Sequence, residues 1–221
     1  MFRRPEWPRG RKLPVTWARI VTRLAAVGLV TVSIVACGLP AEGGRSGELR
    51  GSVMDTPIPK PALTLTDTHG EEFDLRAETD GYLTLLFFGY TNCPDVCPVH
   101  MANLAAVFGD LVPEVRHRIK VVFVTTDPER DTPERLRSWL DNFDPSFIGL
   151  RGSVDSINAA LAEMLLPGVA VLPAEHGGEP MIGHPAAVIA FSADGLARVR
   201  YPFGVRQMDW AHDLPLLVEG S

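Results

Sequence analysis

Two cysteines, Cys93 and Cys97, are the residues of this sequence whose type and spacing are best suited to chemistry. Each is followed by proline, and the pair comes shortly after an apolar run that ends at Gly89. At the start of a helix, thiols ionise readily and can exchange disulfides or bind a metal ion. A structural disulfide is the weakest of the three interpretations, because closing so short a loop restrains the unfolded chain little.

Three residues separate the two cysteines, whereas thiol–disulfide exchange proteins usually carry C-x-x-C. The wider spacing still permits a disulfide, and it also lets both sulfur atoms converge on one ion. Two soft thiolates favour Cu(I) over harder cations, while zinc requires three or four protein ligands. A metal site therefore needs a third donor, which directs attention to the histidines. Three of the six have solvated or unremarkable contexts: His69, His117 and His212.

The other three histidines are better placed to complete a site. His100 follows Cys97 by three residues, although an ordinary exposed position on a helix is the simpler interpretation there. His176 and His184 belong to a long segment rich in glycine and proline. His184 comes just before a predicted strand at residues 186–191, so we expect the sheet to hold its position.

Apolar runs and helix-start signals predict the elements that must position these side chains. Residues 82–88 and 120–125 are apolar nearly throughout, as strands covered on both faces are. Thr132 followed by proline, and Ser153, are typical helix N-caps. The other predicted elements are a hairpin at 62–66 and 71–75, strands at 147–150, 186–191 and 197–201, and helices at 98–108, 133–143, from 153 onward and at 208–218.

Strands that alternate with helices, followed by a closing hairpin, predict an α/β fold. We expect a central mixed sheet flanked by helices, with an extra N-terminal hairpin. Residues 167–183, which contain several prolines and glycines, are predicted to form a loop. Active groups in such folds gather beyond the carboxyl ends of strands, which is where Cys93 and Cys97 fall.

The N-terminal 36 residues have the composition of an export signal. A basic stretch precedes 13 uncharged residues, which are too few to span a membrane, and Ala36-Cys37-Gly38 ends the segment. This ending resembles a bacterial lipobox and predicts cleavage before Cys37, lipidation of its sulfur and a location on the extracytoplasmic face of the membrane. An uncleaved signal anchor with a free thiol at Cys37 is the alternative. Residues 37–56 are predicted to be a flexible tether and residues 57–218 the folded domain.

The charge of the chain argues against nucleic-acid binding. Residues 1–36 hold seven of the 21 basic residues and one of the 27 acidic residues, so the remainder carries a net charge of −12. Such a domain repels phosphate backbones.

Three segments together resemble the Sco/SenC family: GYTNCPDVCP, VTTDPERDTPERL and HPAAVIAFSADGLARVRYPFG. The resemblance extends over about residues 57–218. It implies a thioredoxin-like fold and copper bound by Cys93, Cys97 and His184. It also implies a role in assembling cytochrome c oxidase, either by delivering copper to the subunit that carries the CuA site or by keeping the cysteines of that site reduced. Other copper chaperones are possible partners, and a thioredoxin-type thiol–disulfide oxidoreductase is the alternative function.

Two acidic residues also match the family, whereas one proline departs from its pattern. Asp127 and Asp131 match acidic positions of the family, where they would support the metal site or dock a partner; a turn and a helix cap are the simpler explanation. Pro185 follows His184 where the family usually has a small polar residue. Because proline restricts the residue before it to extended geometry, Pro185 either holds the imidazole rigidly or turns it away.

Overall fold

The structure is a computed structural model that describes residues 48–173 and 180–220. The predicted signal peptide at residues 1–36, the predicted lipidation site Cys37 and the histidine His176 lie outside the described residues. In the part that is described, no helix has the length and apolar character needed to cross a membrane.

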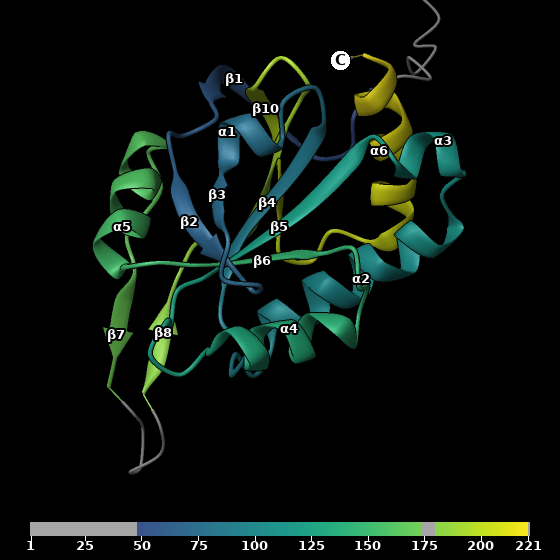
Figure 1. Ribbon diagram of the computed structural model, residues 1–221. Helices are drawn as coiled ribbons and strands as arrows, with labels where there is room; N and C mark the ends of the chain where they lie inside the picture. The colour runs from purple at the N-terminus through teal and green to yellow at the C-terminus, as the bar shows by residue number, and fades with distance from the viewer. Residues whose placement is uncertain (1–47, 174–179, 221) are drawn as a thin grey trace, which may run out of the picture. The chain divides into compact units, whose positions relative to one another are not determined.

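Eight strands form one mixed sheet with the order β1-β10-β9-β4-β5-β6-β2-β3 (Figure 1). The central strands β4, β5 and β6 are parallel to one another, whereas every other pairing is antiparallel. The strand bounds are β1 Ser52–Pro59, β2 Thr64–Asp67, β3 Glu72–Asp74, β4 Leu83–Gly89, β5 Ile119–Thr125, β6 Ile148–Arg151, β9 Ala187–Phe191 and β10 Leu196–Pro202. The apolar runs at residues 82–88 and 120–125 correspond to β4 and β5, whose side chains are almost all buried.

Helices cover both faces of the sheet, and the sheet separates the apolar interior into two cores. Helices α2, α4 and α6 contribute to one core, and α5 and the single turn α1 contribute to the other (Figure 1). Their bounds are α1 Leu75–Glu78, α2 Val96–Asp110, α3 Pro113–Arg116, α4 Pro133–Asp141, α5 Val154–Glu163 and α6 Gln207–Glu219. The predicted caps are present: Thr132 and Ser153 each accept a hydrogen bond from a backbone N–H of the first turn.

The structure differs from the sequence-based prediction in several places, of which three bear on the arrangement of the site. β1 begins at Ser52, within residues 37–56 for which we expected a flexible tether, and it pairs with β10. A long-range contact explains this difference. The buried carboxylate of Asp213 on α6 accepts hydrogen bonds from the N–H groups of Arg50 and Gly51, which lie just before the strand. Helix α2 begins at Val96, two residues before the proline predicted to start it. Within the predicted loop 167–183, β7 (Ala170–Leu172) and β8 (Met181–Gly183) pair as a separate two-stranded sheet.

Candidate metal centre

Strand β4 and helix α2 bring the two cysteines together at the carboxyl end of the central sheet. After β4 ends at Gly89, a tight turn follows in which the Cys93 N–H donates to the Tyr90 carbonyl at 3.2 Å. Cys97 lies in the first turn of α2, and its own N–H lies 3.5 Å from Cys93 Sγ. A side chain at Gly89 would place its Cβ 2.8 Å from Cys97 Sγ, so glycine is needed for this close approach.

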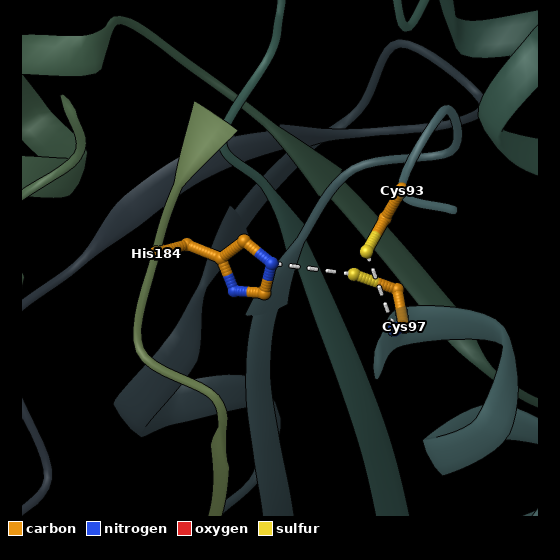
Figure 2. Close-up of side chains that lie close together, drawn as sticks. All are labelled: Cys93, Cys97 and His184. Atoms are coloured by element: carbon orange, nitrogen blue, oxygen red, sulfur yellow. Dashed lines mark hydrogen bonds between the residues drawn. The ribbon is translucent and has the colours of Figure 1, made fainter. Parts of the chain in front are cut away.

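The third side chain at this place is His184, which follows β8 and precedes β9. Its Nε2 lies 3.5 Å from Cys97 Sγ, as Figure 2 shows. Its Nδ1 lies 3.1 Å from the carbonyl oxygen of Pro185. Since a carbonyl can only accept, Nδ1 carries the hydrogen and Nε2 keeps its lone pair directed towards the thiols. Pro185 therefore does not turn the imidazole away, and its carbonyl orients the ring.

Two aromatic rings enclose the imidazole of His184. The rings of Tyr90 and Phe87 meet it edge to face, with centroids 5.7 Å and 5.9 Å away. Phe87 lies near the end of β4, and Tyr90 follows directly after it. The imidazole is thus held by contacts with two aromatic rings and by a hydrogen bond from its Nδ1 to a backbone carbonyl.

The donor atoms of Cys93, Cys97 and His184 all lie within 4.8 Å of one another. Among the described residues this is the group of cysteine, histidine and acidic side chains whose spacing suits a metal ion. Two sulfurs and one imidazole nitrogen form a soft donor set, suited to copper and short of the four ligands of a structural zinc site. The arrangement fits a soft ion held by three ligands.

The two thiols differ strongly in acidity. Hydrogen bonding from the Cys97 thiol is the largest cause that lowers the pKa of Cys93 to about 3, against the opposing effect of burial. Burial, together with the negative charge on Cys93, raises the pKa of Cys97 far above its ordinary value. The metal-free pair therefore shares one proton at neutral pH, with a thiolate at Cys93 and a thiol at Cys97. Binding a cation there would release this remaining proton from Cys97.

Asp131 supports the turn that carries Cys93. Its buried carboxylate accepts hydrogen bonds from the Thr91 N–H and from the hydroxyls of Thr91 and Thr125. Arg135 extends this network, since its guanidinium donates to the Thr91 hydroxyl and to the Asn92 side chain. The Asp131 carboxylate thus links Thr91, which follows β4, to Thr125 at the end of β5, next to the turn that carries Cys93.

Asp127, the other acidic residue named from the sequence, pairs with Arg130. The Arg130 guanidinium lies 6.0 Å from the centre of the Tyr90 ring, which in turn meets His184. This route from Asp127 to the candidate metal centre passes through two intervening side chains. Tyr90, Thr91 and Arg135 were not singled out from the sequence. The only signal for them is their position in two of the segments that resemble the family, GYTNCPDVCP for Tyr90 and Thr91 and VTTDPERDTPERL for Arg135.

We expect Asp131→Ala to lower the free energy of unfolding by about 3 kcal/mol, because it leaves three buried donors without their acceptor. Urea unfolding of the metal-free, reduced chain measures this loss. Asp141→Ala is the matched control, since Asp141 lies at the end of α4 with its side chain 48% exposed and forms only a surface pair with Arg137. Equal losses in both variants would contradict the role assigned to Asp131.

One of the remaining histidines lies in an environment that differs from the prediction. His100 is buried rather than exposed, and its burial lowers the pKa of the imidazole. His212 pairs with Asp213 on α6 through a 2.8 Å contact. His69 lies exposed in the hairpin turn between β2 and β3, as predicted. Among the described histidines, His184 is the one that the fold brings into the cysteine pair.

Comparison with known proteins agrees with this geometry. The profile of the family described as SCO1/SenC matches residues 55–219, which is most of the chain. The chain belongs to the SCO1/SenC family. A protein of Stutzerimonas stutzeri that is named for copper binding is 30% identical to this SCO1/SenC protein over 168 residues, covering 74% of this chain and 81% of that protein.

Solved structures of the family share the fold. The copper-bound structure of Bradyrhizobium japonicum ScoI matches with a TM-score of 0.62 and 29% identity, over 72% of this chain and 98% of that one. The solution structure of apo Sco1 from Thermus thermophilus matches with a TM-score of 0.67 and 28% identity, over 77% and 97% of the two chains. The predicted thioredoxin-like α/β fold, with a mixed sheet flanked by helices, is confirmed.

Proposed function

We propose that this SCO1/SenC protein binds copper through Cys93, Cys97 and His184 and delivers it to the CuA centre during assembly of cytochrome c oxidase. The observation that carries the proposal is the convergence of the three donor atoms within 4.8 Å, although His184 is 87 residues from Cys97. The similarity to a copper-bound family structure and to a relative named for copper binding supports copper as the ion.

Three protein ligands suit transfer better than storage. A three-coordinate Cu(I) ion has room for an incoming thiolate, which replaces the bound ligands one at a time. The oxidation state of the ion does not change in this exchange. Each incoming thiol loses its proton on binding the ion; one proton returns to Cys97 as it departs, and any other passes to solvent, because Cys93 departs as a thiolate. Cys93 is 9% exposed and Cys97 is fully buried, so an acceptor meets the ion first from the side of Cys93 and His184.

The second candidate function is thiol–disulfide exchange, and the acidity of Cys93 favours it. A thiolate at Cys93 would attack one sulfur of a target disulfide, forming a mixed disulfide and releasing the other sulfur as a thiolate. Cys97 would then lose its proton and attack Cys93 Sγ, which releases the reduced target and leaves a Cys93–Cys97 disulfide. The target gains two electrons, and the pair supplies them.

Transfer to a CuA domain separates the two functions. We expect the Cu(I)-loaded chain to pass copper to a soluble, metal-free CuA domain whose cysteines are reduced, with copper measured in each protein after they are separated. A CuA domain with both ligand cysteines replaced by serine is the control and should gain no copper. The alternative would prevail if copper stays on the chain, while the metal-free reduced chain rapidly reduces a CuA domain whose cysteines form a disulfide.

We also propose that residues 1–36 are removed and that lipid on Cys37 anchors the domain at the extracytoplasmic face of the membrane. The basic and apolar composition of residues 1–36 supports this, together with the small residues around Cys37. Stable anchoring needs more than one acyl chain, each contributing about 0.8 kcal/mol per buried CH₂.

In bacterial cells, the mature chain should appear in the membrane fraction with a lipidated Cys37 at its N-terminus, as detected by mass spectrometry. Cys37→Ala should prevent both lipidation and removal of the leader. An unmodified Cys37 in a chain that still carries residues 1–36 would instead establish the signal-anchor alternative.

A further inference from the structure

His100 lies between the helix that carries Cys97 and the segment that carries His184. It lies on α2 one turn after Cys97, and only 2% of it is exposed. Its imidazole packs between the ring of Phe87, with centroids 5.0 Å apart, and that of Phe203, with centroids 5.8 Å apart. Phe87 also contacts the ring of His184. His100 therefore belongs to the aromatic wall of the site without being one of its three donor residues.

The polar contact of His100 reaches the segment that carries His184. Nε2 of His100 lies 3.1 Å from the carbonyl oxygen of Ala186. Because that oxygen can only accept, Nε2 carries the hydrogen and donates it. The bond joins α2, which bears Cys97, to a segment 86 residues away along the chain.

The segment held in this way has little regular structure of its own. Residues 184–186 connect β8 to β9 and belong to neither strand, and Pro185 has no N–H to donate. Two successive carbonyls of the segment have imidazole donors: Pro185 receives Nδ1 of His184, and Ala186 receives Nε2 of His100. Holding the Ala186 carbonyl therefore fixes the peptide next to the group that orients His184.

We propose that His100 is a positioning residue for the copper site, which ties the helix of Cys97 to the loop of His184 and so keeps the His184 Nε2 directed at the thiols. This inference rests on the proposed copper function. Its effect falls mainly on Cu(II), because imidazole suits that ion, whereas the two thiolates that suit Cu(I) lie on one local turn. His100 thus determines how well the site holds copper in its oxidised state.

A purely structural role would make a different demand on this position. A buried imidazole needs a hydrogen-bond partner, whereas leucine or phenylalanine would fill an apolar space without one. Loss of the donor is therefore separable from loss of volume. His100→Phe keeps a ring between Phe87 and Phe203 and removes the donor, while His100→Gln keeps an N–H at a similar reach.

The test uses the full chain, purified in detergent, in a Cys37→Ala background so that Cys93 and Cys97 are its only thiols. We expect His100→Phe and His100→Leu to release Cu(II) about ten-fold faster or more, which is the range of losses when partners that orient a metal ligand are removed. The nitrogen hyperfine coupling of bound Cu(II) should weaken in the same variants. Cu(I) affinity should stay within about three-fold of the parent, since both thiolates remain.

Two variants serve as controls. His100→Gln should restore most of the Cu(II) retention. His212→Leu removes an imidazole that bonds Asp213 on α6, and it should leave both Cu(II) readouts unchanged. Parent-like Cu(II) release and nitrogen coupling in a folded His100→Phe or His100→Leu chain would overturn the inference, whatever the change in thermal stability.

A measurement on the unsubstituted, metal-free chain does not depend on whether the variants fold. In a spectrum of the ¹⁵N-histidine-labelled chain, His100 should be the Nε2–H tautomer with a slowly exchanging proton; the Nδ1–H tautomer would overturn the inference. Failure of the proposed function has its own signature. His184→Ala would then leave the nitrogen coupling of Cu(II) unchanged, and the role of His100 would fall with it.

Discussion

Replacing both Cys93 and Cys97 by serine should abolish tight Cu(I) binding, whereas the reduced parent chain should bind one Cu(I) per molecule. A serine hydroxyl is a poor ligand for a soft ion, and His184 alone cannot hold it. The loss should exceed the roughly 10–100-fold cost of removing an outer partner of a metal ligand. Competition with a colorimetric Cu(I) chelator measures the affinity.

The third cysteine of the chain provides the matched control. Cys37→Ala should leave the stoichiometry and the affinity as in the parent, because the proposed site does not include it. Each single variant, Cys93→Ser or Cys97→Ser, should bind measurably more weakly than this control. Stoichiometric binding of Cu(I) by the double serine variant would remove the copper proposal.

Alkylation of Cys93 in the reduced, metal-free chain should proceed at nearly the same rate from about pH 5 to about pH 8. An ordinary thiol with a pKa of about 8.5 reacts roughly 800-fold faster at the upper end of this range, because its thiolate fraction rises by that factor. Cys93, with its pKa lowered to about 3, is almost fully ionised throughout, so its thiolate fraction does not change. Since a low pKa also weakens a nucleophile, the absolute rate at pH 8 should be below that of an exposed ordinary thiol.

Mass spectrometry of peptides quenched at timed intervals gives the rate for each cysteine separately. Cys97 should remain almost unmodified, because it is fully buried and its pKa is raised. Cys97→Ala removes the largest cause of the low pKa at Cys93, so the pH dependence should return in that variant. A rate in the parent that rises about ten-fold per pH unit would show that Cys93 is an ordinary thiol.

The prediction from the sequence was most successful where structure depends on neighbouring residues. β4 and β5 were predicted because a strand buried on both faces must be apolar along its whole length. α4 and α5 were predicted from Thr132 and Ser153, whose side chains bond N–H groups only three residues away. β1 was missed because its placement depends on Asp213, more than 150 residues further along the chain.

The candidate metal centre divides in the same way. Cys93 and Cys97 lie within one turn of each other in the sequence, so their spacing by itself determined that two sulfurs would meet. His184 was selected from six histidines mainly by resemblance to the family, together with its place just before a predicted strand. Asp131 was named through the resemblance, but the three hydrogen bonds by which it holds the cysteine turn, and the buried position of His100, could not be read from the sequence.

Only the tertiary structure decided which distant side chains join the cysteines, and the physical reason is the register of the sheet. β9 runs antiparallel to β4 with Leu86 opposite Ile189, so the start of β9 lies beside the end of β4. The residues just before β9 are thereby carried to the turn that follows β4, whatever their own local preference. A period of two along each strand determines which faces are apolar, but it does not determine which strand lies beside which.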